Sequence, residues 1–384
     1  METRPLGQAS PSVEAGLSLG PMRKALSFRD TDWFLLALAV AIAAIGVVEI
    51  YSTTAHTALA GQHRKQIEWI CLGCLAALVV SRIDYHAIIE RVPWFFGLSV
   101  VALAGLLVSG HSIARAKRWL PLGGAGTLQV SELVKVVIIL GVAAILAEKR
   151  GQYVTWKELA KLGILAGVPA VLVALEPDLG TALTFFPIVA AGAFLAGVHP
   201  RQMALVALFG LLMLPVAWHF TRSYQRERIM TFFHPSQDTR GSSYQATQSK
   251  IAIGSGGFWG KGTGNGTQSR LGFIPVSQAD FLFAAYAEEH GFIGTLFAML
   301  LYLVLLLRLL DGAQMAGDRA GTLLVACFAA LLFFQVFVNV GMMIGFLPVT
   351  GIPLPLMSQG GSSVISTFLG LGLAMSVRTR RLVN

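Results

Sequence analysis

Long apolar runs separated by short polar segments make up most of the chain after residue 32. A run of about 17 to 25 apolar residues is long enough to cross the hydrocarbon core of a bilayer as a helix. The clearest runs lie at residues 33–51, 92–109, 179–198, 203–220, 281–307, 321–347 and 353–376. Weaker runs lie at residues 67–80, 133–147 and 159–175. The pattern therefore predicts an all-α integral membrane protein with about ten transmembrane helices.

The same pattern divides the chain into one membrane domain and two tails. We expect a single ten-helix domain at residues 33–376, preceded by a polar tail at 1–32 and followed by a short tail at 377–384. The polar start has no small-residue cleavage site before the first apolar run, so we interpret it as a tail rather than a signal peptide. Residues 221–280 are expected to form a large extracytoplasmic loop before the eighth helix.

The composition excludes a water-soluble single domain, because 55% of the residues are hydrophobic and only 13% are charged, against about 25% charged in soluble proteins. The net charge of +9 would indicate nucleic-acid binding only if it formed a patch. In a membrane protein it is expected from cytoplasmic loops. With both termini inside, sixteen Lys and Arg residues lie in cytoplasmic segments and only five in the short outer loops. This asymmetry predicts that both termini are cytoplasmic, and no nucleic-acid partner is expected.

The predicted outer loop carries apolar groups that a disordered linker would lack, among them Met230, Phe233, Phe258 and Trp259. We therefore expect a folded loop at the outer membrane interface. Seven glycines between residues 254 and 266 could bring backbone amides close to an anion. They could equally serve tight turns, and the spacing leaves both interpretations open. The three cysteines, at positions 71, 74 and 327, lie in apolar runs and predict neither disulfides nor metal binding.

Ionisable residues inside the spans are functional candidates, because each costs several kcal/mol unless it is paired or hydrated. Glu49 and Glu68 lie within about one helical turn of a span end, where an interfacial position accounts for them. Glu132 and Lys135 are three residues apart and share a helix face. Mutual neutralisation is the simpler interpretation of that pair, and substrate binding is the alternative.

Two further carboxylates flank the outer ends of spans. Asp178 could cap the following helix or serve a site, and both interpretations are equally supported. Asp280 closes the long loop, where it could be a helix N-cap or a general base at the membrane interface. Glu288 is eight residues further on, turned by about 80° and about 12 Å deeper, so it could approach the same interior. The basic and aromatic loop at Arg118 and Trp119 could hold an anionic, lipid-linked headgroup.

A series of short motifs connects these candidates in order along nearly the whole chain. The motifs are Arg118-Trp119-Leu120, Ser131-Glu132-Leu133-Val134-Lys135, Pro177-Asp178-Leu179-Gly180-Thr181, Tyr224-Gln225-Arg226, the stretch 248–257, Gly260-Lys261-Gly262, Ala279-Asp280-Phe281, Ala287-Glu288-Glu289 and Gly351-Ile352-Pro353-Leu354-Pro355. This series resembles the SEDS family (shape, elongation, division and sporulation). Residues 251–254 and 348–353 are more similar to the members that determine rod shape than to the division members.

The resemblance implies a peptidoglycan glycosyltransferase of the bacterial plasma (inner) membrane. Such an enzyme polymerises lipid II together with a class B penicillin-binding protein, a transpeptidase that crosslinks the new strands. The family's catalytic aspartate falls on Asp280. Its other polar cavity positions fall on Glu132, Lys135 and Asp178, with Arg118 and Trp119 in the outer loop. Lys261 and Glu288 complete the candidate substrate-binding set.

The resemblance also supplies a mechanism to test. We expect Asp280 to take the proton from the 4-hydroxyl of the acceptor sugar as it attacks the anomeric carbon of the donor. The pyrophosphate leaving group needs cationic stabilisation, for which Arg118, Lys135 and Lys261 are candidates. A divalent cation could assist, although no metal ligand or cofactor is assigned. One base without a covalent intermediate suffices for inversion at the anomeric carbon.

Departures from the family pattern leave two other functions open. Gln278 and Ala279 stand where family members usually have His-Thr, so a neighbour that could orient Asp280 is missing. A lipid II flippase would use Glu132, Lys135 and Asp178 to line a path for the headgroup. Candidate charges confined to the outer half of the spans favour the enzyme, because a path needs polar groups at both depths. A noncatalytic scaffold for the transpeptidase is the third possibility.

Overall fold

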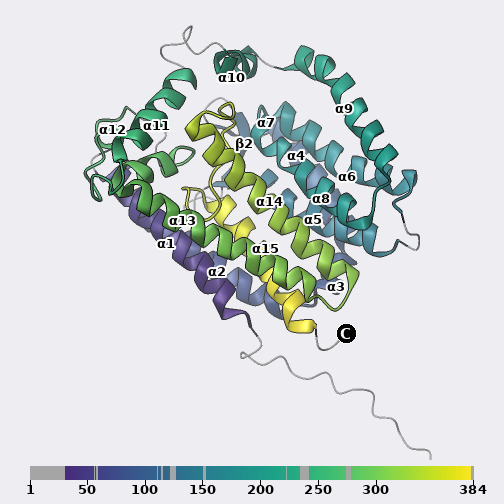
Figure 1. Cartoon of the computed structure of the whole chain (residues 1–384). Helices are drawn as coiled ribbons and strands as arrows, with labels where there is room; N and C mark the ends of the chain where they lie inside the picture. Colours follow the sequence, from purple (N-terminus) through teal and green to yellow (C-terminus); the bar gives the residue numbers. More distant parts are fainter. Residues whose placement is uncertain are drawn as a thin grey trace, which may run out of the picture.

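The computed structural model describes residues 31–381, except 56, 58, 110, 114–115, 122–126, 150–152, 222, 234–241 and 274–277. The described residues are almost entirely helical (Figure 1). The helices are α1 (Trp33–Thr54), α2 (Gln62–Arg82), α3 (Tyr85–Ile89), α4 (Val92–Ser109), α5 (Val130–Ala147), α6 (Trp156–Leu175), α7 (Leu179–Leu183), α8 (Phe185–Ala196), α9 (Pro200–Phe220), α10 (Ser223–Phe233), α11 (Ser242–Gly256), α12 (Thr267–Arg270), α13 (Leu282–Gln314), α14 (Arg319–Ile344) and α15 (Gly361–Arg380). The predicted helical membrane class is confirmed, whereas most of the predicted N-terminal tail lies outside the described residues.

A small antiparallel sheet was not predicted. Its strands β1 (His111–Ile113), β2 (Ala116–Pro121) and β3 (Thr127–Gln129) pair in the order β1-β2-β3. Strands of three to six residues are too short to show the alternation that identifies a strand in a sequence. The sheet fills the connection between α4 and α5.

Each of the ten predicted spans contains a helix. Six stretches are long and apolar enough to cross a membrane, namely α1, α5, α6, the α7–α8 pair, α13 and α14. Shorter apolar stretches lie in α4 and α9, at Val92–Val108 and Pro200–Met213. These helices indicate a multi-pass membrane protein, while the number of ten crossings stays a prediction.

Two predicted spans are interrupted where the sequence suggested continuous helices. The helix at 179–198 breaks at Thr184, because Pro187 lacks a backbone N–H and its ring clashes with the carbonyl four residues earlier. The last helix begins at Gly361 rather than at residue 353. Pro353 and Pro355 cannot donate backbone hydrogen bonds, and Leu356 has a φ of 68°. Residues 351–360 therefore form a non-helical segment before α15.

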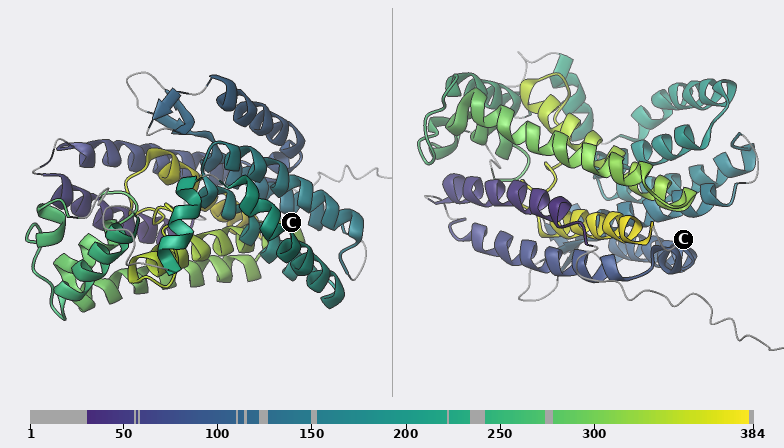
Figure 2. Two further views of the ribbon diagram at one scale, coloured as in Figure 1. Left: turned by 90° about the horizontal axis from the view of Figure 1, so that it is seen from above. Right: turned by 60° about the horizontal axis from the view of Figure 1, so that its bottom comes forward.

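The bundle has two distinct ends (Figure 1). At the loop end, α10, α11 and α12 lie over the helices. At the termini end, α1 begins and α15 finishes close to the C-terminus. Figure 2 shows α2 running alongside both α1 and α15, in agreement with their packing contacts, and α13 and α14 pack next to them. Helix α9 stands apart from this core, and most of its described side chains are exposed.

The predicted folded loop is confirmed, because residues 223–233, 242–256 and 267–270 are helical and α11 packs against α13 and α14. The hydroxyl of Ser249 donates to the carbonyl of Met343 at 2.9 Å, which fastens α11 to α14.

The glycine-rich part of the loop fits into a break in α13 at Gly291, where φ is 64° and ψ is −161°. The backbone N–H groups of Lys261 and Gly262 donate to the carbonyls of Glu288 and Glu289, at 3.1 and 2.8 Å. After the break, the N–H of Phe292 donates to the carbonyl of residue 257 at 2.9 Å. The loop therefore replaces helical hydrogen bonds that the break removes, as buried backbone in a membrane protein requires. The amides of Lys261 and Gly262 thus serve tight packing, as the tight-turn interpretation expects, while anion binding by the other amides of the glycine run stays a prediction.

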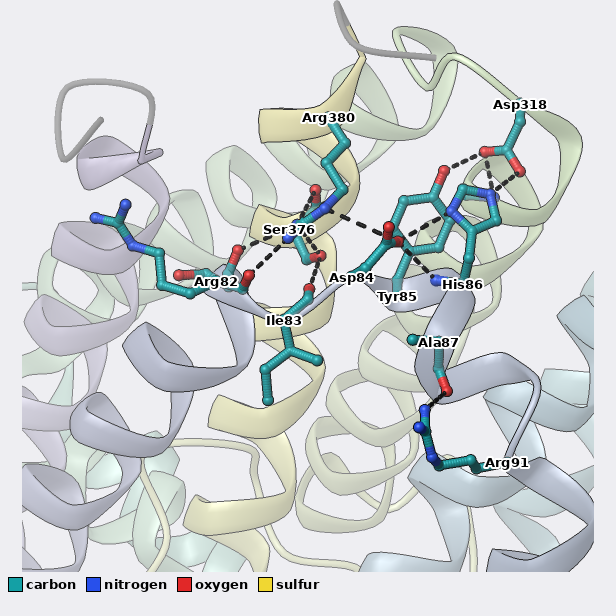
Figure 3. Close-up of polar contacts among 12 residues, drawn as sticks. Arg82, Ile83, Asp84, Tyr85, His86, Ala87, Arg91, Asp318, Ser376 and Arg380 are labelled. Carbon is teal, nitrogen blue, oxygen red and sulfur yellow. Dashed lines mark hydrogen bonds and ion pairs between the residues drawn. The ribbon is translucent and has the colours of Figure 1, made fainter. Parts of the chain in front are cut away.

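A polar network ties the helices together at the termini end (Figure 3). The two ring nitrogens of His86 lie 3.0 and 3.1 Å from carboxylate oxygens of Asp84 and Asp318. Arg380 of α15 donates to the hydroxyl of Ser376 at 2.6 Å and to the carbonyl of Arg82 at 2.6 Å. The network joins the ends of α2, α3, α14 and α15. Several candidate site residues instead lie at or near the first two turns of helices, namely Glu132 and Lys135 in α5, Asp178 before α7, and Asp280 and Glu288 before and in α13.

Candidate active site

Asp280 lies at the loop end, just before α13, and its backbone is held from two sides. Asn339 of α14 donates from Nδ2 to the carbonyl of Asp280 at 3.1 Å and to the carbonyl of Ile352 at 2.8 Å. The hydroxyl of Ser358 donates to the carbonyl of Ala279 at 2.7 Å. Asn339 is fully buried, so one side chain fixes both the start of α13 and the non-helical 351–360 segment.

Asp280 is not the N-cap residue of α13. The N-cap is Phe281, whose side chain makes no capping hydrogen bond. The side chain of Asp280 is only partly buried, so its carboxylate lies at the edge of the protein interior.

The carboxylate of Asp280 and the guanidinium of Arg228 border the same glycine. A Cβ atom at Gly351 would lie 3.5 Å from Oδ2 of Asp280 and 3.7 Å from Nη1 of Arg228. Gly351 has a φ of 74°, a conformation that favours glycine. Nη1 of Arg228 also lies 3.4 Å from the carbonyl oxygen of Val349, to which it donates. The Asp280 carboxylate and the Arg228 guanidinium, which come from opposite ends of the folded loop, thus both lie beside Gly351, which has no side chain.

Asp178 caps α7, so the capping interpretation is confirmed. Its Oδ1 accepts from the backbone N–H of Thr181 at 3.2 Å, and its Oδ2 accepts from the Thr181 hydroxyl at 2.9 Å. Oδ2 also accepts from Nε2 of Gln129 at 2.8 Å. The first turn of α7 presses against the segment that contains Gly351, since a Cβ at Gly180 would lie 2.4 Å from the carbonyl oxygen of Thr350. Asp178 thus belongs to the wall next to Asp280.

Glu132 and Lys135 form the predicted pair in the first turns of α5. Their charged atoms are 2.7 Å apart and both side chains are buried. The hydroxyl of Ser366 in α15 donates to Glu132 at 3.1 Å. Lys135, Gln335 and Ser366 line a cavity of about 10 Å³, which has room for about one water molecule. The pair therefore neutralises its own charge in the interior.

Trp119 lies in β2 directly opposite Gln129 in β3, and Gln129 is the residue that contacts Asp178. Trp119 is half-buried. The sheet thus places this aromatic ring one strand away from the wall formed by Asp178. Arg118 lies next to it in β2, but its side chain falls outside the described part of the structure.

Glu288 and Lys261 organise the loop. Their charged atoms are 2.7 Å apart, and Glu288 is fully buried. Glu288 also accepts from the backbone N–H groups of Thr267, Gln268 and Ser269, at 2.8, 3.1 and 3.4 Å. These amides begin the short helix α12. The described contacts of Glu288 are with the loop. None of these contacts brings Glu288 beside Asp280.

Glu49 does not reach water at the end of α1, where the interfacial interpretation expected it to. Its side chain is fully buried, and neither carboxylate oxygen has a hydrogen-bond partner among the described residues. Proximity to the end of an apolar run did not reveal burial, because the loop folds over the end of α1 and excludes water there.

Sequence analysis missed two residues that shape the Asp280 site. Arg228 was one of seven basic residues in the long loop, and nothing in its spacing distinguished it. Asn339 lies deep in a predicted span. An uncharged polar side chain in an apolar run is a signal for an internal hydrogen bond, and that signal could have identified it.

Comparisons with known proteins agree over nearly the whole chain. The FtsW/RodA/SpoVE family model, described as cell cycle protein, matches residues 32–382. The peptidoglycan glycosyltransferase MrdB of Escherichia coli strain K12 is 35% identical over 354 residues, covering 91% of this chain and 94% of that protein. The peptidoglycan glycosyltransferase RodA of Treponema pallidum strain Nichols is 30% identical, with coverages of 92% and 98%.

Solved structures show the same similarity. One is a chain in a peptidoglycan synthase complex described for its structural coordination of polymerization and crosslinking. That chain is 32% identical with a TM-score of 0.78, and the match covers 92% of this chain and 99% of that one. The crystal structure of the rod shape determining protein RodA of Thermus thermophilus is 30% identical with a TM-score of 0.68, and covers 92% and 98%.

Proposed function

This chain belongs to the FtsW/RodA/SpoVE family of cell cycle proteins, and from this premise we propose how it works as a peptidoglycan glycosyltransferase. Homologous glycosyltransferases at 30–35% identity over most of the chain support the activity. The observation that carries the site is the Asp280 carboxylate at the start of α13, beside Gly351 and Arg228. We assign the role of general base to Asp280.

In this proposal Asp280 accepts the proton from the 4-hydroxyl of the acceptor sugar as that oxygen attacks the anomeric carbon of the donor. The bond to the pyrophosphate breaks on the opposite face, so an α-linked donor gives a β-linked polymer. The clamp by Asn339 holds the peptide of Asp280, so the base does not depend on a flexible loop for its position. Positioning of this kind contributes a large part of the rate in group transfer.

The leaving pyrophosphate needs positive charge close to the base. Lys135 and Lys261 each form an ion pair with a buried carboxylate, which reduces their value for this purpose. Arg228 borders the same glycine as Asp280, so we assign it this role, together with Arg118 from the sheet. A divalent cation that assists the leaving group stays part of the proposal.

The substrate is proposed to be lipid II, and the partner a class B penicillin-binding protein. The similarity to a chain of a complex that polymerises and crosslinks peptidoglycan supports this partner. We further propose that the chain resides in the bacterial inner membrane with both termini cytoplasmic, because basic residues are concentrated in the segments on the termini side. The loop end would then face the compartment in which the cell wall is assembled.

The test uses the purified full chain with its penicillin-binding partner and fluorescent lipid II. Wild type should form glycan strands, and Asp280→Ala should form none above background while still binding the partner. Undiminished polymer from Asp280→Ala would overturn the role of the base. Lipid II translocation without polymer by the wild type would instead indicate a flippase, and an inert wild type that still stimulates crosslinking would indicate a scaffold.

A further inference from the structure

Three side chains that can ligate metals meet where α1 passes the break in α13. Glu49 lies about one turn before the end of α1, and Glu289 and His290 directly precede the break at Gly291. One ligand atom from each side chain lies within 4.8 Å of the others. The packing of α1 against α13 brings them together from distant parts of the sequence, so the cluster is a product of the fold.

Glu49 is the unusual member. It is 0% exposed, and neither of its carboxylate oxygens has a hydrogen-bond partner among the described residues. The nearest ion-pair partner is Nδ1 of His290, 3.8 Å from Oε2, which is beyond hydrogen-bond distance. Glu289 is also buried and adds a second carboxylate. Burying one unpaired carboxylate is already costly, so two adjacent ones call for a positive charge between them.

The other two ligands are held in place by hydrogen bonds. Glu289 accepts from the hydroxyl of Ser52 at 2.5 Å and from the backbone N–H of Gly264 at 3.0 Å. Nε2 of His290 lies 3.3 Å from the hydroxyl of Thr263. Nδ1 of His290 also lies 3.2 Å from the carbonyl oxygen of Tyr286, which can only accept a hydrogen bond. A cation bound at Nδ1 therefore has to displace the proton that this nitrogen donates to Tyr286. Nε2–H would then donate to Thr263, and a partner on the second ring nitrogen is what orients metal-binding histidines.

We propose that Glu49, Glu289 and His290 bind one divalent first-row transition cation, such as Zn²⁺ or Mn²⁺. Two carboxylates would balance the charge of such an ion, and the imidazole favours a transition metal over Mg²⁺ or Ca²⁺. Ligands at about 2.1 Å in a tetrahedron are about 3.4 Å apart. The ligand atoms lie within 4.8 Å of one another, so the widest separation that this limit allows has to shrink by about 1.4 Å when the ion binds.

The cation would join three parts of the molecule. Glu49 belongs to α1, Glu289 and His290 belong to α13, and the glycine loop supplies the N–H of Gly264 and the hydroxyl of Thr263. This loop also leads to Asp280 at its far end. The site thus has a structural role in fastening the loop to the membrane helices, and its existence does not depend on the proposed catalytic role of Asp280.

The test measures metal binding by the purified full chain in detergent. The protein is stripped with a chelator, incubated with Zn²⁺ or Mn²⁺, passed through a desalting column and analysed for metal content. Wild type should retain about one ion per chain and unfold at a higher temperature with the ion bound. Glu49→Gln and His290→Gln should each weaken binding by more than about tenfold, since even the residues supporting metal ligands have effects of this size.

Matched controls separate this site from others. Glu68→Gln removes an exposed carboxylate near the start of α2, and it should bind the metal as wild type does. Asp280→Ala should also keep its ion, because Asp280 is not part of the cluster. X-ray absorption of the Zn²⁺-loaded wild type should show one imidazole among oxygen ligands.

Three results would overturn the proposal. Wild type that retains no ion would mean that Glu49 is kept neutral by a proton instead. Binding that is unchanged in Glu49→Gln would place the ion elsewhere on the protein. A zinc absorption spectrum without an imidazole ligand would exclude His290.

Discussion

The insertion of the glycine loop into the break of α13 can be tested by a single substitution that adds one methyl group. Gly291→Ala adds a methyl group at a residue whose φ is 64° and ψ is −161°, a region that essentially only glycine occupies. The new Cβ would also lie 2.3 Å from the backbone nitrogen of Gly260. Both the strain and the clash push the loop away from the break.

The cost can be worked out from the contacts at the break. Strain in this region costs about 1–3 kcal/mol. Four backbone hydrogen bonds join the loop to α13, from Lys261, Gly262, Phe292 and Ile293. Each contributes about 0.5–1.5 kcal/mol, so displacement of the loop should cost at least about 3 kcal/mol altogether. The unfolding entropy is about 2 cal/mol/K per residue, so for 384 residues 1 kcal/mol corresponds to about 1.2 °C of unfolding midpoint. The midpoint should therefore fall by about 4 °C or more.

The assay is thermal unfolding of the purified protein in detergent, followed by lipid II polymerisation at a temperature at which the variant is folded. Polymerisation should also fall. Gly260, which contacts Gly291, lies in the same loop that ends at Asp280, so displacement of the loop should disturb the position of the base. Gly254→Ala is the matched control: it lies in α11, and nothing lies within 4 Å of its added Cβ. Its midpoint should be unchanged or slightly higher. Equal midpoints for the two variants would refute the insertion.

Three other substitutions test the walls of the site. Gly351→Val places a branched side chain between Asp280 and Arg228, and should reduce polymerisation by about tenfold or more while partner binding persists; full activity would show that this space is not used. Asn339→Leu leaves two buried carbonyls without their donor, and unfolding should become easier by about 2 kcal/mol or more; an unchanged midpoint would mean that the clamp is not formed. Lys135→Met strands Glu132 in the interior and should cost about 3–5 kcal/mol. Adding Glu132→Gln should recover most of that loss, and no recovery would contradict an internally neutralised pair.

The helices were predictable because apolar length is set by the membrane. Each predicted run contains a helix, and the order of the runs follows from the chain alone. The breaks at Thr184 and before Gly361 were not predicted, although the prolines that cause them are visible in the sequence. A proline hardly lowers the hydrophobicity of an apolar run, so a search by hydrophobicity does not detect the helix break that the proline causes.

The candidate site was predictable as a set of positions and less so as a set of contacts. The pairing of Glu132 with Lys135 and the capping by Asp178 were foreseen, because both depend on neighbours within one turn of helix. The partners of Asp280 come from α10, α14 and the 351–360 segment, and no local pattern encodes such contacts. The same reason explains Glu49, whose burial depends on a loop more than 200 residues away.

The most direct test of the account is the rate of glycan polymerisation by Asp280→Asn in complex with the penicillin-binding partner. The amide has nearly the same shape as the carboxylate but cannot accept the proton. Asp311→Asn serves as the control, since it makes the same change near the other end of α13, the helix that Asp280 precedes. Asp280→Asn should slow polymerisation by about 100-fold or more, with partner binding and unfolding midpoint as in wild type, and Asp311→Asn should be fully active. Polymerisation by Asp280→Asn at the wild-type rate would contradict the central claim.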